Sequence, residues 1–134
     1  MAKAVPLFSG SKGNSYFLGT ATQGVLIDAG RSCKQIENAL LKNSIDPRII
    51  GAVFITHEHT DHCSAVKVLA SRYNFKVYAS QGTLEALERA NRLDKRFETE
   101  VIENEVAVGD MLIRTMPLKA VATVLRLQTE RLPQ

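Results

Sequence analysis

The sequence has few of the residues that mark secreted or membrane proteins. It contains no tryptophan and only two cysteines, Cys33 and Cys63, which are too few for a disulfide framework. No apolar run approaches the ~20 residues of a transmembrane helix, and residues 1–6 hold no apolar stretch long enough for a signal peptide. With 134 residues, 45% of them hydrophobic, we expect one soluble cytoplasmic domain without a membrane partner and with reduced thiols.

Charge of one sign is also scarce, and the net charge is only +3. Residues 1–110 hold 13 basic and 13 acidic residues, so the whole excess lies in residues 111–134. A few surplus charges in one tail do not make a nucleic-acid-binding surface. Charge therefore neither supports nor excludes a nucleic-acid substrate.

Apolar patterns predict strands that alternate with helices. We expect strands at residues 5–8, 15–20, 25–27, 52–55, 76–78, 99–102, 106–108 and 111–116. We expect helices at residues 33–43, after an N-cap at Ser32, and at residues 65–71 and 83–90. This alternation predicts an α/β layer structure. Residues 118–134 differ, because they contain no glycine or aromatic residue and their leucine spacing predicts an amphipathic helix.

All three histidines, His57, His59 and His62, lie within six residues, and Asp61 lies among them. They follow the apolar run 52–55, and α/β folds usually place their sites at the carboxyl end of such a strand. In an extended segment His57 and His59 point the same way and can share one metal ion, while Asp61 and His62 can reach a second ion. These ligands suit zinc, and also manganese or iron. Two ions roughly 3.5–4 Å apart can bridge a hydroxide and lower the pKa of its parent water towards ~7, and Asp61 could both bind metal and orient the water.

Three neighbouring features have plainer interpretations. Cys63 adjoins the motif, but a buried thiol explains it better than a ligand role. The segment Gly10-Ser11-Lys12-Gly13-Asn14-Ser15 lacks Walker A spacing and is interpreted as a hairpin, with substrate contact from Ser11 or Asn14 as the alternative. Asp28 ends a strand, and its carboxylate can hydrogen-bond the backbone or the metal loop, so we expect structural support rather than catalysis.

The segment Ile55-Thr56-His57-Glu58-His59-Thr60-Asp61-His62, together with Ile27-Asp28-Ala29-Gly30, resembles the metallo-β-lactamase superfamily. The opening Phe8-Ser9-Gly10-Ser11-Lys12-Gly13-Asn14-Ser15 is similar to its YycJ-type branch, a group regarded as exonucleases or phosphodiesterases. The resemblance covers residues 5–117 and implies an α/β fold, half of an αβ/βα sandwich with a mixed sheet and flanking helices. It implies that His57 and His59 ligate a first metal ion and that Asp61 and His62 ligate a second. It also implies that Asp28 buttresses the site.

The second half of the family's site is absent from the sequence. The family adds a third histidine on the first ion, a bridging aspartate and a later histidine, but no histidine follows His62. We therefore expect an N-terminal part of a metallo-β-lactamase domain at residues 1–117 and a divergent tail at residues 118–134. A frameshift or misjoined frame, which we favour, or a genuinely short protein would explain the tail. Such a half would expose an apolar sheet face and self-associate.

The resemblance implies a metal-dependent hydrolase that attacks a phosphodiester with a metal-bound hydroxide. Nucleic acid is the implied substrate, two divalent ions are the implied cofactors, with zinc preferred, and Asp61 is the candidate catalytic residue. The missing ligands predict that this chain alone is inactive. Hydrolysis of a thioester or small ester uses the same motif and is one alternative. A non-enzymatic half-domain that binds metal is another, because four ligands shared over two ions leave each ion under-coordinated.

Overall fold

The computed structural model describes residues 3–9, 13–56, 65–93, 97–102, 105–108, 111–117 and 125–131. One sheet holds β1 (Lys3–Phe8), β2 (Ser15–Gly19), β3 (Gly24–Ile27), β4 (Ile50–Phe54), β5 (Lys76–Ala79) and β6 (Thr99–Val101). A second sheet holds β7 (Glu105–Val108), β8 (Met111–Pro117) and β9 (Leu125–Arg131). The helices are α1 (Cys33–Lys42), α3 (Val66–Tyr73) and α4 (Gln81–Arg89), with a 3-10 helix η1 (Pro47–Ile49). The strands and helices expected before residue 118 are present, within two residues of the predicted bounds.

The six-stranded sheet is mixed, with its strands in chain order from β1 to β6. The β1–β2 and β2–β3 pairs are antiparallel, and the three remaining pairs are parallel. Two successive antiparallel pairings give β1 the same direction as β3, β4, β5 and β6. The carboxyl ends of these five strands therefore lie along one edge, and α/β folds usually bind their ligands at such an edge.

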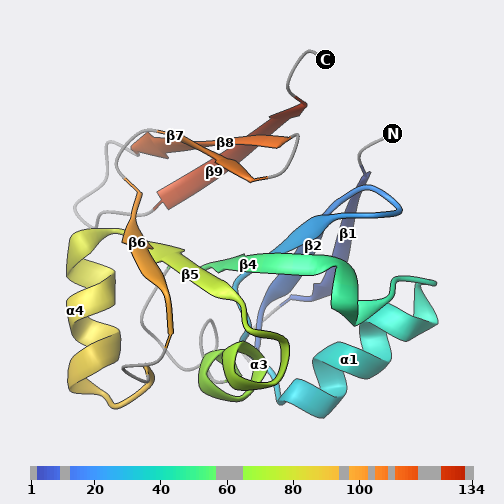
Figure 1. Cartoon of the computed structure of the whole chain (residues 1–134), viewed down its shortest axis with the longest axis horizontal. Helices are drawn as coiled ribbons and strands as arrows, with labels where there is room; N and C mark the ends of the chain where they lie inside the picture. The colour runs from blue at the N-terminus through green and yellow to red at the C-terminus, as the bar shows by residue number, and fades with distance from the viewer. Residues whose placement is uncertain are drawn as a thin grey trace.

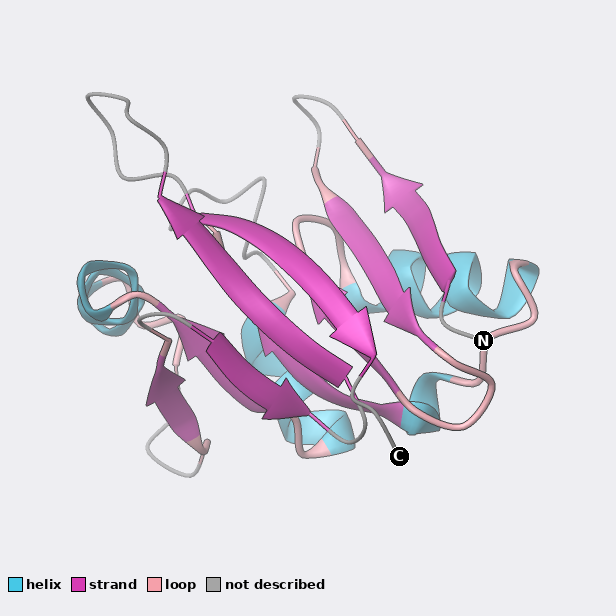
Figure 2. Cartoon of the chain, turned by 90° about the horizontal axis from the view of Figure 1, so that it is seen from above, coloured by secondary structure: helices cyan, strands magenta, loops and turns pink. Residues whose placement is uncertain are grey.

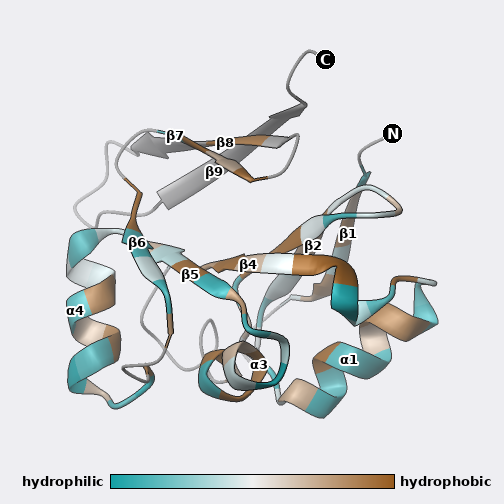
Figure 3. Ribbon diagram, viewed as in Figure 1, coloured by the Kyte–Doolittle hydropathy of each residue, from teal (hydrophilic) through white to brown (hydrophobic). Residues whose placement is uncertain are grey.

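The molecule is built in three layers. The helices lie against one face of the six-stranded sheet, and the three-stranded sheet lies over the other face (Figures 1 and 2). Alternation of side chains supplies both faces: on β3, Leu26 packs in the helix-side core, whereas Val25 and Ile27 pack in the core beneath the second sheet. The apolar run of β4, coloured by hydropathy in Figure 3, divides between the two cores in the same way, as expected for a strand buried on both faces.

Serine caps set the starts of α1 and α4. Ser32 Oγ accepts a hydrogen bond from the Gln35 N–H at 3.2 Å, and Gln35 Oε1 accepts one from the Ser32 N–H at 3.3 Å. This capping box supplies partners for backbone groups that the first turn leaves unpaired, and it confirms the N-cap predicted at Ser32. Ser80 caps α4 by accepting from the Thr83 N–H at 3.2 Å.

The last strand corrects one prediction. An amphipathic helix was expected after Leu118, but residues 125–131 form β9, which pairs antiparallel with β8 from Met111↔Arg131 to Pro117↔Leu125. The alternation Leu125-Arg126-Leu127-Gln128 also suits a strand, and backbone pairing with β8 outweighs the weaker helical preference. Whether residues 118–134 form a divergent tail stays a prediction.

The face opposite the helices, where an exposed apolar surface was expected, is packed in the described structure. Val25 and Phe54 on this face are at most 1% exposed, and Ile113 of β8 is fully buried against them. The structure of a single chain does not test self-association, which stays a prediction. No helix within the described ranges is long and apolar enough to cross a membrane.

Candidate metal centre

The metal motif begins at the sheet edge defined by the carboxyl ends of the parallel strands. The ladder between β3 and β4 continues past β3, because the Asp28 N–H donates to the Phe54 carbonyl at 2.7 Å. The Ile55 N–H likewise donates to the Tyr78 carbonyl at 2.9 Å. Thr56 is the last described residue before the motif. The predicted metal ligands themselves lie outside the described residues: His57, His59, Asp61 and His62.

Asp28 holds the start of the motif segment. Its side chain is only 3% exposed, and its carboxylate accepts two hydrogen bonds from Thr56, at 2.8 Å from the backbone N–H and at 2.7 Å from the hydroxyl. Asp28 adopts a left-handed backbone with φ of 64°, a conformation that aspartate tolerates better than most residues. The expectation that this carboxylate bonds to the metal loop is confirmed at Thr56, the residue that leads into it.

The far end of the same segment is hydrogen-bonded to Ala29, the residue that follows Asp28. The Ala65 N–H donates to the Ala29 carbonyl at 2.9 Å, and the Ala65 side chain is buried. The segment from residue 57 to residue 64 therefore leaves and re-enters the described structure beside Asp28 and Ala29. Two adjacent residues thus fix both ends of the segment that carries the candidate ligands.

The turn after β1 supports this pair from the other side. Ser15 Oγ donates to the Asp28 carbonyl at 2.8 Å, and the Gly30 N–H donates to the Asn14 carbonyl at 2.9 Å. Gly13 has φ of 141°, and a Cβ built there would lie 2.7 Å from the Gly30 carbonyl oxygen, so only glycine allows this approach. The β1–β2 pairing confirms the hairpin, while residues 10–12 lie outside the described residues.

A polar cluster ties α1 to α3, the helix that follows the motif segment. Glu37 accepts hydrogen bonds from Arg72 at 2.6 Å, from the Tyr73 hydroxyl and from the Cys33 thiol at 3.4 Å. The bond from Tyr73 is the main cause of a lowered pKa for Glu37. Burial, followed by the Glu37 carboxylate, raises the pKa of Tyr73 to about 12. The Glu37 carboxylate thus stays ionised between three donors and ties the last turn of α3 to α1.

Cys33 belongs to this cluster and not to a metal site. Its side chain faces the core, as predicted, and is 7% exposed. Burial, followed by the neighbouring Glu37 carboxylate, raises the pKa of the thiol to about 11. Because the thiolate is the form that binds metal or attacks substrates, this thiol is inert at neutral pH. Cys63 lies outside the described residues.

Sequence reasoning missed the partners of these residues. The link between Asp28 and Thr56 spans 28 positions, and the link between Glu37 and Tyr73 spans 36. Thr56 could have been suspected from its place between a buried strand and the first histidine. Nothing in the local pattern singles out Glu37, beyond its position one helical turn after Cys33.

The donor set fits divalent metal ions. Within the described ranges, no three His, Cys, Asp or Glu side chains gather as ligands, and Asp28 is engaged by Thr56. The candidate ligands are accordingly the three imidazoles and one carboxylate of residues 57–62. Nitrogen and carboxylate donors are those that zinc prefers, and an anchored segment limits the conformations in which they can meet an ion.

The chain is similar to known proteins. Residues 9–123 match the model of the metallo-β-lactamase superfamily. The exodeoxyribonuclease WalJ of Streptococcus pneumoniae serotype 2 is 43% identical over 89 residues, which make up 66% of this chain and 33% of the relative. The exodeoxyribonuclease YycJ of Bacillus anthracis is 38% identical over 82 residues, which make up 61% and 31% of the two chains. The chain thus spans about a third of the length of these curated relatives.

Solved structures show the same fold. A Cronobacter sakazakii metallo-β-lactamase with a HARLDQ motif superposes with a TM-score of 0.75 at 17% identity, over 96% of this chain and 56% of that one. The predicted fold class, a mixed sheet with flanking helices that corresponds to half of a sandwich, is confirmed. The fold implies divalent metal ions in the site. The curated similarities agree with the YycJ-type branch, and the chain belongs to the metallo-β-lactamase superfamily.

Proposed function

We propose that this chain carries the metal-binding half of a phosphodiester hydrolase that acts on nucleic acid. The observation that carries the proposal is the double anchoring of the motif segment by Asp28 and Ala29 at the carboxyl edge of the sheet. Superfamily membership supports metal-dependent hydrolysis, and similarity to two exodeoxyribonucleases supports a DNA substrate. A cytoplasmic location suits this role and stays a prediction.

Each residue of the motif has its own proposed role. His57 and His59 would hold one divalent ion, and Asp61 and His62 a second. Zinc is the preferred ion on donor chemistry, with manganese or iron as alternatives. When bound, such ions supply a nucleophile at neutral pH and offset the negative charge of a phosphodiester. Asp61 would accept a hydrogen bond from the attacking water and orient it. Asp28 and Thr56 contribute indirectly, because the hydrogen bonds between them set where the ligand segment begins.

The ligand set of this chain is partial, because its three histidines all lie within residues 57–62. We propose that the chain alone binds metal but does not turn over substrate. Asp28 is assigned a supporting role and is not counted among the ligands, since both of its carboxylate oxygens accept hydrogen bonds from Thr56. Catalysis would then need further ligands of the kind that complete a two-metal site.

The test compares the full chain with a chimera in which its 89 matched residues replace the corresponding residues of the pneumococcal exodeoxyribonuclease WalJ. Both proteins are supplied with zinc or manganese and assayed on single-stranded DNA and on a thioester. We expect exonuclease activity in the chimera, its loss on Asp61→Asn, and no turnover by the chain alone. A folded chimera that cleaves the thioester but not DNA would overturn the substrate class. Metal uptake without hydrolysis by either protein would favour the non-enzymatic half-domain.

A further inference from the structure

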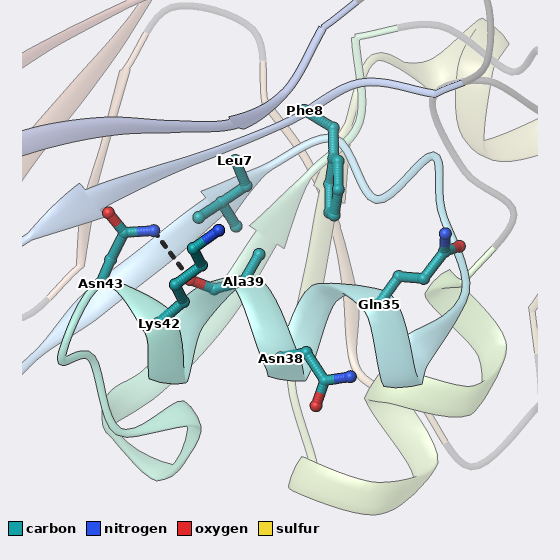
Figure 4. Close-up of a pocket in the computed structure, with 7 residues that line it drawn as sticks. All are labelled: Leu7, Phe8, Gln35, Asn38, Ala39, Lys42 and Asn43. Carbon is teal, nitrogen blue, oxygen red and sulfur yellow. Dashed lines mark hydrogen bonds between the residues drawn. The ribbon is translucent and has the colours of Figure 1, made fainter.

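A groove lies between β1 and α1 and is not used by the proposed metal chemistry. It has a volume of about 540 Å³, and Figure 4 shows the side chains around it. We define this β1–α1 groove by the residues that line it on both elements: Leu7, Phe8, Gln35, Asn38, Lys42 and Asn43. None of the described residues that line it is acidic.

The groove leads to the edge of the sheet that carries the motif. β1 runs parallel in direction to β3 and β4, so Phe8, at the carboxyl end of β1, lies at the same edge as Asp28 and Thr56. α1 starts a few residues after Asp28, so its first turn, with Gln35, is also at this edge, and Lys42 in its last turn is at the far end. A chain-like ligand in the groove would therefore have one end at the sheet edge where the motif segment begins.

Arg31 adjoins the groove through its contact with Phe8. Its guanidinium carbon lies 4.3 Å from the centre of the Phe8 ring, and the Phe8 ring points towards α1 in Figure 4. Arg31 Nε is buried and has no hydrogen-bond partner. The Arg31 side chain is half-buried, and a guanidinium over an aromatic ring keeps in-plane N–H donors of the kind that bind phosphate oxygens.

Lys42 supplies a second unpaired cation. In Figure 4 its ammonium group extends towards β1. Every ion pair within the described ranges involves other cations: Arg48, Arg72 and Lys76. Between the two cations, Leu7 and Phe8 provide apolar surface, and Gln35 and Asn38 provide amide groups. Positive charge at both ends of a partly apolar groove is the combination by which proteins bind single-stranded nucleic acid.

We propose that the β1–α1 groove binds single-stranded nucleic acid and leads it to the metal loop, with Arg31 and Lys42 each binding a backbone phosphate. The proposal rests on the proposed nucleic-acid substrate. Bases would lie against Leu7 and Phe8, and sequence preference would be weak, because phosphate contacts do not distinguish bases. The α1 N-terminus itself is not the phosphate site, since Ser32 and Gln35 already cap it.

The test measures binding of a fluorescent oligothymidylate to the full chain by anisotropy at several salt concentrations. Each phosphate contact to a single strand adds about 0.7 to the salt slope, so Arg31→Gln and Lys42→Gln should each lower the slope by that amount. At 0.1 M salt each change should weaken binding about fivefold, and both together about 25-fold. Arg48→Gln is the charge-matched control, because Arg48 is exposed, pairs with Asp46 and lies on η1 outside the groove. It should leave binding unchanged.

Three results would overturn the proposal for the groove. They are no salt-dependent binding by the wild-type chain, unchanged binding by the double variant Arg31→Gln, Lys42→Gln, and equal weakening by Arg48→Gln. Thermal unfolding of each variant separates loss of contact from loss of fold, and Arg31→Lys, which keeps the charge, should retain most of the slope. Binding by the groove together with an inactive chimera would leave the inference standing while the hydrolase proposal fails. An active chimera, together with unchanged DNA affinity in the double variant, would leave the hydrolase proposal standing while the groove inference fails.

Discussion

Replacing Asp28 by alanine is expected to destabilise the fold and loosen the metal loop together. The substitution removes two hydrogen bonds to a carboxylate that is 3% exposed, worth ~1.5–3 kcal/mol each. It also places alanine at φ of 64°, which costs roughly 1 kcal/mol relative to glycine. Because both bonds go to Thr56 they are not independent, and we expect a total loss of about 4 kcal/mol of unfolding free energy.

A series at this position separates the contributions. Asp28→Gly keeps the left-handed backbone but loses both bonds, so we expect a loss of about 3 kcal/mol. Asp28→Asn keeps one good acceptor and the backbone preference, so we expect about 1–2 kcal/mol. The exposed Asp46→Ala is the control. Free energies come from urea denaturation, where the midpoint should shift at constant slope.

Zinc affinity gives the second readout of the Asp28 series. Loss of a supporting partner of metal ligands typically costs about 10–100-fold in affinity, and we expect a change of that size in Asp28→Ala. Wild-type midpoints for both Asp28→Ala and Asp28→Gly would refute the claim that this carboxylate holds Thr56. Unchanged zinc affinity in destabilised variants would refute the link from Asp28 to the loop.

Three further predictions test other parts of the structure. The pKa of the Cys33 thiol is 9.0 in the unfolded chain and about 11 in the folded one, so the unfolded state loses its proton first. The unfolding free energy should therefore fall as pH rises between these values, by up to about 1.4 kcal/mol per pH unit. Urea titrations should show a flatter pH dependence in Cys33→Ala. Gly13→Ala should destabilise by more than ~1 kcal/mol, because its Cβ would meet Gly30, whereas Gly51→Ala, with open space around it, should be close to neutral in the same assay. Ile113→Ala should cost ~2–5 kcal/mol if the second sheet packs as described, and an unchanged melting temperature would contradict that packing.

The elements that could be predicted from the sequence are those whose signal is local. The apolar run of β4 and the capping box at Ser32 lie within a few neighbouring residues, and both were placed correctly. The helix expected after Leu118 was wrong because β9 is defined by its partner β8. Strand pairing is a long-range property, and a short leucine pattern fits both periods.

The candidate site was likewise predictable only where its signal is local. The four ligand positions follow from a motif within six residues, and their geometry stays a prediction. The hydrogen bonds that anchor the motif come from Asp28 and Ala29, far back in the sequence. The role of Asp28 depends on a left-handed backbone, which no apolar or polar pattern reports. The β1–α1 groove likewise appears only when β1 and α1 are placed side by side.

Zinc titration of the full chain tests the central claim, that residues 57–62 form the metal centre, most directly. Calorimetry should show two ions taken up per wild-type chain, with one lost on joint replacement of His57 and His59 by alanine and the other lost on joint replacement of Asp61 and His62. Cys63→Ser should still bind two ions. Zinc uptake that survives the loss of His57 and His59, or that is abolished by Cys63→Ser alone, would contradict the assignment.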